Sequence, residues 1–292
     1  MSDSPHGQSI PAEDWAGEMG ERWLKNLDRF ESMIAPIGKA LITRAAFRAG
    51  ERVVDIGCGG GATTIEIARR VAPSGEALGL DISPSLVTAA TRRAQAAGVG
   101  NVRFRCADAA VAALDGPPFD RLFSRFGVMF FEDAASAFAN LRRLVQDGAA
   151  ADFSVWAPAR ENAWIAELMQ VAARYVELPT PVPRAPGPFA LDDPDYLRDV
   201  LARVGFGAVR IDTWRGEQLV GGAGASAEEA TDFILEAMSF GRLLADARPQ
   251  TKDALKADVV ALFSRHETAE GVPMPATAFL VRAVAASRSA AA

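Results

Sequence analysis

Residues 53–64 read VVDIGCGGGATT, and this stretch decides the fold. Val53–Ile56 is a short apolar run closed by glycines, which is typical of a buried strand. Gly57 and Gly59 can adopt backbone angles that are closed to other residues, and without a Cβ they let a ligand approach the main chain. The following helix would present free N–H groups to the polar end of that ligand. The stretch predicts a ligand-binding strand–turn–helix unit, with tight packing alone as the weaker interpretation.

Short apolar runs and helical patterns alternate from this unit to Trp156. This rhythm predicts a parallel sheet with helices on both faces, which is a doubly wound, Rossmann-like α/β fold. The expected strands are Val53–Ile56, Ala77–Leu80, Val102–Cys106, Asp120–Phe123 and Asp152–Trp156, and the expected helices between them are Thr63–Val71, Pro84–Ala97 and Ala134–Val145.

The flanking segments follow a different pattern. Residues 12–49 have helical spacing, and Pro36 is expected to split them into two helices. We expect an N-terminal helical cap at 1–49 and a binding domain at 50–292, with a helical insertion at about 219–270. An insertion of that length usually covers a site or pairs subunits, so a homodimer is one of the two expectations for it. The expected later elements are helices Asn162–Val176, Asp195–Val204, Ala227–Ala247 and Thr251–Arg265 and strands Val209–Trp214 and Thr277–Val284.

Composition excludes several function classes. The chain has 292 residues, 49% of them hydrophobic and 23% charged, as in ordinary globular proteins. Its net charge of −6 gives no sign of the excess of basic residues that nucleic-acid-binding proteins have. Cys58 and Cys106 are too few for a disulfide framework or a zinc site, so no metal is expected. No signal peptide and no membrane-spanning run is visible, so we expect a cytoplasmic protein without membrane contact.

Acidic residues end the second and third expected strands. Asp81 lies twenty residues beyond Gly61, where a carboxylate can accept hydrogen bonds from both hydroxyls of a ribose. A helix N-cap is the alternative role for Asp81, although Ser83 suits that role better. Asp108 is placed to accept from an adenine amino group, and a solvated turn explains it equally well on spacing alone.

The fourth and fifth strands add Ser124, Arg125, Phe126 and Trp156. Because parallel strands end at one edge of a sheet, these segments should converge with the glycine loop on one crevice. The spacing Gly57-x-Gly59-x-x-Ala62 also satisfies the dinucleotide fingerprint. The loop alone therefore leaves a nicotinamide-dependent oxidoreductase open, although no Tyr-x-x-x-Lys pair is visible.

Together these motifs resemble the class I S-adenosylmethionine-dependent methyltransferases of the bacterial small-molecule type. Asp55-x-Gly57-x-Gly59-x-Gly61 resembles their first motif, and the segments 78–83, 106–109 and 119–131 resemble those after the next three strands. The resemblance implies seven strands with the last antiparallel, N-terminal helices over the cofactor, and methyl transfer to a small molecule by in-line displacement. Gln146–Ala149 departs from the family's common Pro-Gly-Gly turn.

The resemblance also implies a set of site residues. S-adenosylmethionine, with S-adenosylhomocysteine as product, is the expected cofactor. Trp15, Trp23 and Trp156 are candidates for an acceptor pocket, whereas Phe130 and Phe131 are expected in the core. Arg125 is expected to meet the cofactor carboxylate, an anionic substrate or a neighbouring helix. The expected cofactor-binding residues are Asp55, Gly57, Cys58, Gly59, Gly61, Asp81, Ile82, Ala107, Asp108, Ala109, Ser124, Arg125 and Phe126.

No catalytic base is identified. His6 lies in the N-terminal tail and His266 at the end of a late helix, while Tyr175 and Tyr196 are scattered. A base is needed only if the methyl acceptor arrives protonated. A non-catalytic cofactor-binding scaffold that meets a partner through residues 227–265 is the third interpretation.

Overall fold

The computed structural model describes residues 12–287 and contains a seven-stranded sheet in the order β3-β2-β1-β4-β5-β7-β6. Strands β1 to β5 pair in parallel, and β7 runs antiparallel to both β5 and β6. The doubly wound fold and the antiparallel last strand are confirmed. The strands are β1 (Arg52–Ile56), β2 (Glu76–Asp81), β3 (Val102–Cys106), β4 (Phe119–Arg125), β5 (Val145–Trp156), β6 (Phe206–Val220) and β7 (Val272–Ala285).

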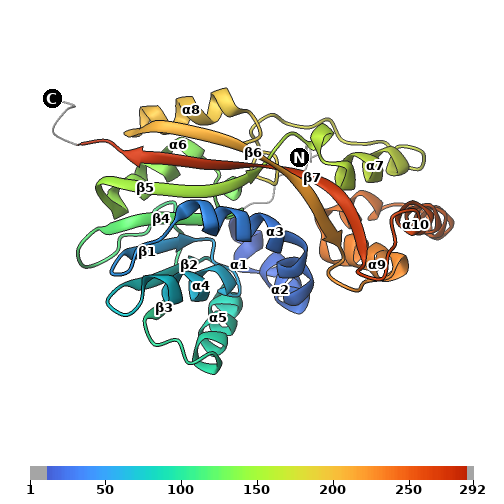
Figure 1. Ribbon diagram of the computed structural model, residues 1–292. Helices are drawn as coiled ribbons and strands as arrows, with labels where there is room; N and C mark the ends of the chain where they lie inside the picture. Colours follow the sequence, from blue (N-terminus) through green and yellow to red (C-terminus); the bar gives the residue numbers. More distant parts are fainter. Residues whose placement is uncertain (1–11, 288–292) are drawn as a thin grey trace.

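Helices cover both faces of this sheet (Figure 1). Helices α3 and α4 contact each other on one side, and α6 and α8 contact each other on the other. None of the helices in the described part of the chain combines the length and apolarity needed to cross a membrane. The helices are α1 (Ala12–Ala16), α2 (Glu18–Lys25), α3 (Leu27–Ala45), α4 (Ala62–Val71), α5 (Pro84–Ala96), α6 (Ala134–Leu144), α7 (Ala163–Ala172), α8 (Pro194–Arg203), α9 (Ala227–Ala237) and α10 (Pro249–Ser264), with 3₁₀ turns η1 (Val128–Phe130), η2 (Ala159–Glu161) and η3 (Ser239–Leu244).

The prediction that Pro36 splits the N-terminal helices is wrong. The chain breaks instead at Gly17 and Asn26, and Pro36 lies exposed inside α3. Proline in a helix interior costs about 3 kcal/mol. The apolar stripe of α3 continues on both sides of it, through Ile34 and Ile37, and burying each such side chain contributes about 1.5–3 kcal/mol. Burial of that stripe keeps the helix continuous.

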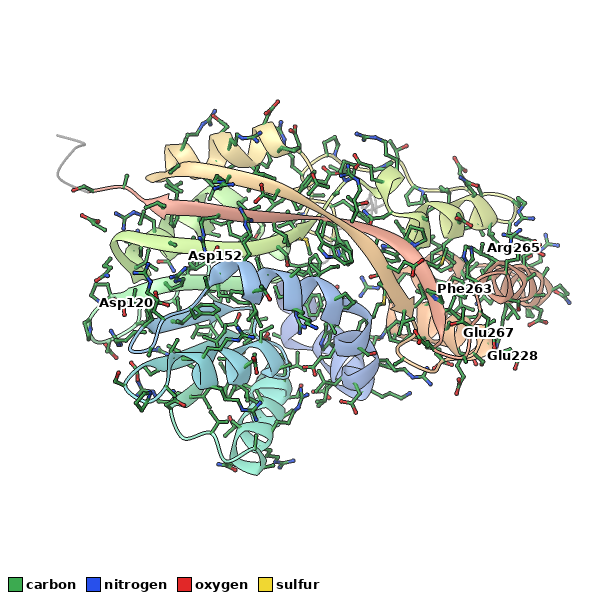
Figure 2. All side chains as sticks on the ribbon, viewed as in Figure 1. Asp120, Asp152, Glu228, Phe263, Arg265 and Glu267 are labelled. Carbon is green, nitrogen blue, oxygen red and sulfur yellow. The ribbon has the colours of Figure 1, made fainter. Side chains whose placement is uncertain are left out.

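The last two strands form a ribbon much longer than the predicted Val209–Trp214 and Thr277–Val284. β6 and β7 pair from Phe206 opposite Ala285 to Val220 opposite Val272. The ribbon carries α9, η3 and α10 at its far end (Figure 1). The single helix expected at Ala227–Ala247 is two elements, since the backbone becomes extended at Met238. Figure 2 places Phe263 and Glu267 at this end of the molecule, far from Asp120 at the opposite end of the sheet.

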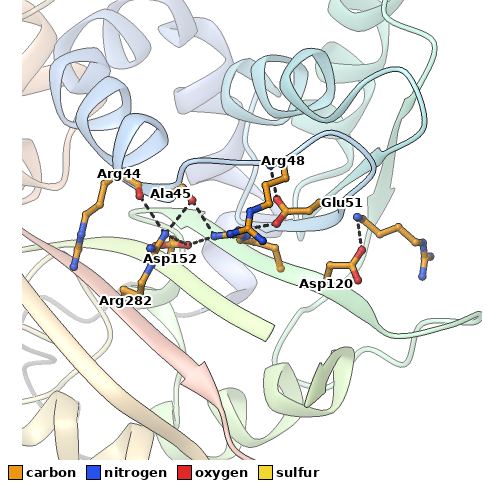
Figure 3. A network of polar contacts seen from close by, with 9 residues as sticks. Arg44, Ala45, Arg48, Glu51, Asp120, Asp152 and Arg282 are labelled. Carbon is orange, nitrogen blue, oxygen red and sulfur yellow. Dashed lines mark hydrogen bonds and ion pairs between the residues drawn. The ribbon is translucent and has the colours of Figure 1, made fainter. Parts of the chain in front are cut away.

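A buried ionic network ties the sheet to the end of α3 (Figure 3). Asp152 on β5 is fully buried and accepts from Arg282 Nε at 2.7 Å and from Arg121 Nη1 at 3.2 Å. Arg282 Nη2 also donates to the main-chain oxygens of Arg44 and Ala45, at 3.1 and 3.0 Å. Because carbonyls at a helix C-terminus lack partners within the helix, this contact anchors α3 against β5 and β7.

Candidate functional site

The glycine loop is held against β2 by hydrogen bonds. Gly59 N donates to Asp81 Oδ2 at 2.8 Å, and Cys58 N donates to the Leu80 carbonyl at 3.0 Å. Gly57 and Gly59 have φ of 65° and 54°, in the left-handed region that favours glycine. A Cβ on Gly57 would lie 2.6 Å from Gly127 Cα, whereas one on Gly59 would meet only Trp23 Nε1, at 3.8 Å. A glycine is therefore needed at position 57 because a Cβ would not fit there, whereas at position 59 only the positive φ favours glycine.

Asp55 lies fully buried beneath the loop. Its Oδ2 accepts from the Thr63 and Thr64 hydroxyls, at 2.8 and 2.7 Å, so α4 is joined to β1. Its Oδ1 has no hydrogen-bond partner among the described residues. Burial raises the pKa of Asp55 to about 6, against the hydrogen bonds from the two threonines. A buried carboxylate oxygen without a partner is costly and suits a ligand's N–H donor.

Asp81, at the end of β2, organises the next turn. Its Oδ1 accepts from Ser83 N at 2.9 Å, and burial raises its pKa. Ser83 Oγ accepts from Leu86 N and caps α5, so the helix-cap role falls to Ser83 as expected. Each Asp81 oxygen accepts one backbone N–H and has a further lone pair for a hydroxyl donor.

Asp108, after β3, has a local role as well as a place in the site. Its Oδ1 accepts from Ala110 N at 2.8 Å, and the residue is half-buried. Asp108 therefore combines the turn role with a place on the cavity lining.

Arg125 ends β4 and packs against α3. A Cβ on Gly38 would lie 2.9 Å from Arg125 Cδ, so the small residue makes room for this side chain. Its Nε is buried and has no partner among the described residues. Burial lowers the pKa of Arg125, while the carboxylates of Glu31 and Asp55 raise it. A buried guanidinium of this kind calls for an anion.

The neighbours of Arg125 fix the ends of the strands. Ser124 Oγ donates to the Ile56 carbonyl at 2.7 Å and accepts from Gly127 N at 3.2 Å. Phe126 has φ of 63°, an uncommon angle for a bulky residue, and its ring stacks on Trp156 with centroids 4.3 Å apart. Strain of this kind clusters at functional sites.

These segments meet at one cavity with about 1180 Å³ of empty space, counting its open mouth. Twelve of the sixteen expected residues line it, and Asp55, Cys58, Gly61 and Ser124 lie behind the lining. Burial raises the pKa of the Cys58 thiol. The twelve that line the cavity are Trp15, Trp23, Gly57, Gly59, Asp81, Ile82, Ala107, Asp108, Ala109, Arg125, Phe126 and Trp156.

The two N-terminal tryptophans of the cavity wall come from different helices. Trp15 lies on α1 and Trp23 on α2, and their rings meet edge to face at 5.6 Å. Phe130, expected in the core, packs on Trp15 at 4.8 Å, and both Phe130 and Phe131 line the cavity. Lining residues that sequence reasoning missed are Phe30, Met33, Ile34, Ile56, Leu80, Leu86, Gly127, Met129, Trp164, Pro188 and Met238.

The tyrosines and the described histidine lie outside the lining. Tyr175 donates to Asp258 at 2.6 Å, Tyr196 packs under Arg184, and His266 follows α10 with its Nε2 3.8 Å from a Glu167 oxygen. His6 is outside the described residues. Within residues 12–287 no group of three or more His, Cys, Asp or Glu side chains is arranged to hold a metal ion.

Comparison with known proteins relates this site to one family. Residues 53–148 match the family model described as a methyltransferase domain. Aklanonic acid methyltransferase DauC of Streptomyces sp. (strain C5) is 32% identical over 113 residues, which are 39% of this chain and 51% of that protein. The chain thus spans about half of that relative's length.

Solved structures share the fold over nearly the whole chain. A phosphoethanolamine N-methyltransferase from Haemonchus contortus, in complex with S-adenosylhomocysteine, has a TM-score of 0.57 at 15% identity, covering 97% of this chain and 62% of that one. The [4+2]-cyclase SpnF also has a TM-score of 0.57, at 16% identity, covering 97% of this chain and 100% of that one. Both likenesses concern the fold, and SpnF shows that the fold also serves another reaction.

Proposed function

We propose that this chain, which belongs to the class I S-adenosylmethionine-dependent methyltransferase family, moves a methyl group from that cofactor to a small-molecule acceptor. The observation that carries the proposal is a pair of buried atoms without partners. Asp55 Oδ1 and Arg125 Nε lie at adjacent strand ends beside the glycine loop. An ammonium and a carboxylate would satisfy them, and the methionine end of the cofactor has both groups.

The same pair argues against a nicotinamide cofactor. Its pyrophosphate would have to lie on the glycine loop, directly above the Asp55 carboxylate. Burial would weaken screening of that repulsion. An ammonium at this position is attracted instead, so the charge of the site favours the sulfonium cofactor.

The rest of the cavity fits the remaining parts of this cofactor. Asp81 on β2 would accept from the ribose hydroxyls, and Asp108 would accept from the adenine amino group. β1 separates Asp81 from Arg125 by two strand spacings, roughly 10 Å, so the adenosine and amino-acid ends would lie on opposite sides of the loop. Gly57 and Gly59 allow close approach, and Ile82, Ala107, Ala109 and Phe126 offer apolar contacts, while Cys58, Gly61 and Ser124 shape the loop from behind.

When bound, S-adenosylmethionine supplies an electrophilic methyl group on a positively charged sulfur. The chain's own residues bind and orient the two reactants, and holding reactants in line supplies much of the rate of such displacements. Trp15, Trp23 and Trp156 form part of an apolar wall that excludes water from the reacting atoms. We assign these three to the acceptor side.

Several expectations about the whole protein stay proposals. The expected helical cap at 1–49 stays a proposal, supported by the part of the cavity wall that α1 to α3 supply. A cytoplasmic location, independence from nucleic acid and a homodimer are also predictions. Light scattering of the full chain tests the dimer.

Calorimetry with S-adenosylmethionine, S-adenosylhomocysteine and NAD tests the cofactor. We expect both sulfur ligands to bind and NAD to bind far more weakly, and tight NAD binding without response to the sulfur ligands would refute the proposal. Asp81→Ala should weaken binding strongly. Transfer of a labelled methyl group into small molecules of a cell extract tests turnover, which the SpnF likeness makes a separate question.

A further inference from the structure

We propose that the methyl acceptor is a flat, apolar acid that enters the cavity as an anion and is methylated on its ionised oxygen. The inference rests on the proposed function and concerns the part of the cavity that the cofactor groups leave free. Trp15 Nε1 is assigned as the donor that holds an acceptor oxygen.

The free part of the cavity is built from planar side chains. Trp15 meets Trp23 and Phe130 edge to face, and the stacked pair Phe126 and Trp156 continues to Trp164 with centroids 5.5 Å apart. Met33, Met129 and Met238 also line the cavity. Aromatic walls with adaptable thioethers favour ligands with flat ring systems.

The polar side-chain groups on this wall are hydrogen-bond donors. They are the indole N–H groups and the Arg125 guanidinium, which the proposed function gives to the cofactor carboxylate. Trp164 Nε1 already donates to Asn162 Oδ1 at 3.3 Å. Trp15 Nε1 is buried and has no partner among the described residues. A buried indole N–H usually finds an acceptor, so a ligand oxygen is the natural partner here.

The carboxylates among the described lining residues lie away from the acceptor side of the cavity. Asp81 ends β2 and Asp108 follows β3, on the side assigned to adenosine. The donors on the acceptor side stabilise an oxygen anion, and an indole or a guanidinium does not take up a proton at neutral pH. An acceptor that is already ionised matches this wall.

The chemistry then balances without a proton. The ionised oxygen attacks the methyl carbon and forms the oxygen–carbon bond. The carbon–sulfur bond breaks, and its electron pair stays on sulfur. One negative and one positive charge disappear, which gives a neutral ester and a neutral thioether. Carboxylic acids have pKa values near 4 and meet this requirement at neutral pH, whereas a simple phenol with a pKa near 10 does not.

Binding of a matched pair of probes tests the inference on the full chain. The probes are 2-naphthoate and 2-naphthamide, which share the flat ring system and differ in charge. Calorimetry is run on complexes with S-adenosylhomocysteine and with sinefungin, an unreactive analogue that carries an ammonium in place of the sulfonium. We expect the sinefungin complex to bind the acid at least tenfold more tightly than the amide. We expect the S-adenosylhomocysteine complex to bind the acid less tightly than the sinefungin complex does.

The variant Trp15→Phe keeps an aromatic ring and removes the indole donor. We expect it to lose about tenfold in affinity for 2-naphthoate while its affinity for S-adenosylhomocysteine is unchanged. The matched control is Trp214→Phe, since Trp214 is a half-buried indole on β6 outside the cavity lining. This control should bind both probes as the wild type does.

The outcomes distinguish a failure of the proposed function from a failure of the inference about the acceptor. Failure of the wild-type chain to bind any sulfur ligand would overturn the proposed function and this inference with it. Normal binding of those ligands with equal affinity for acid and amide would overturn this inference alone. An acid preference that Trp15→Phe leaves unchanged would overturn the assignment of Trp15.

Discussion

Asp55 and Arg125 project from adjacent parallel strands on the same face of the sheet. Asp55 pairs in register with Phe123, two residues before Arg125, and alternate residues of a strand share a face. The negative group interacts favourably with the positive one, yet each keeps one buried polar atom without a partner in residues 12–287. A zwitterion would complement both charges, with Arg125 on the cavity lining and Asp55 directly behind it.

The variant Arg125→Gln tests the positive side of this gap. We expect the affinity for S-adenosylhomocysteine to fall roughly 10- to 100-fold, because a hydrogen bond to a charged group contributes about 1.5–3 kcal/mol. 5′-Methylthioadenosine lacks the amino-acid end and should bind within twofold of wild type. Calorimetry measures both. An equal loss for the two ligands would mean that Arg125 supports the cavity instead of reading a carboxylate.

The pH dependence of binding tests the negative side. The pKa of Asp55 is raised to about 6, and an ammonium beside it would lower that value in the complex. Binding would then release a proton below pH 6, so affinity should rise by roughly tenfold from pH 5 to pH 7. The Asp81 pKa is also raised, but both ligands have the ribose that Asp81 is proposed to bind. The ratio of S-adenosylhomocysteine to 5′-methylthioadenosine affinity isolates Asp55, and a ratio that stays flat with pH would contradict the assignment.

The same raised pKa predicts the stability of the ligand-free protein. A folded pKa above the unfolded value means that the native state binds more protons between pH 4 and 6. The contribution of Asp55 to stability is therefore present below about pH 4 and lost as pH rises through 6. Asp55→Asn should remove this dependence, retain an acceptor for Thr63 and Thr64, and raise the melting temperature at pH 7.5 while weakening S-adenosylhomocysteine binding. A variant with an unchanged pH profile of stability would argue against the raised pKa.

Gly59 and Gly98 form a matched pair for testing the loop. Both have positive φ, 54° and 65°, and no heavy atom within 3.4 Å of a new Cβ. Alanine should cost each about 1–2 kcal/mol of unfolding free energy from the left-handed backbone. Gly59→Ala alone should also reduce cofactor affinity, since its Cβ would face the ligand. Urea melts and calorimetry measure the two effects, and equal cofactor affinity in both variants would show that the ligand does not approach Gly59.

The ionic network predicts a contrast between two aspartates. Asp152→Ala leaves Arg282 and Arg121 without their buried partner, so we expect a loss of about 3–5 kcal/mol. Asp212 pairs with Arg44 at 2.7 Å but is half exposed, and Asp212→Ala should cost less than about 1 kcal/mol. Chemical denaturation measures both. Similar losses would show that burial of the network contributes little.

Strands β1 and β2 of the proposed cofactor site were predictable from sequence because each contains a short apolar run closed by a glycine or an aspartate. Val102–Cys106 matches β3 residue for residue, and β1 differs from its prediction by one residue. Residues at the carboxyl ends of parallel strands converge by topology, so the sequence alone predicts that Asp81, Asp108 and Arg125 lie at one edge of the sheet.

The opposite wall of the cavity was not predictable in the same way. Met33 and Ile34 belong to the buried stripe of α3, and their spacing does not distinguish core packing from cavity lining. The helix break predicted at Pro36 was wrong for a related reason. The helix continues because the apolar stripe of α3 is buried in the tertiary structure, and the local sequence does not show that burial. The length of β6 was hidden because its middle residues are mostly exposed and polar, so the strand lacks a continuous apolar run.

The β6–β7 ribbon has a consequence for how such proteins diversify. Val220 and Val272 are paired across the ribbon, so the 51 residues between them leave and rejoin the chain at neighbouring points. Replacing this segment would disturb none of the hydrogen bonds among β1 to β5. Met238 from this segment reaches the cavity wall. Exchanging this segment between homologous chains would therefore change the choice of acceptor and leave the cofactor-binding strands unchanged.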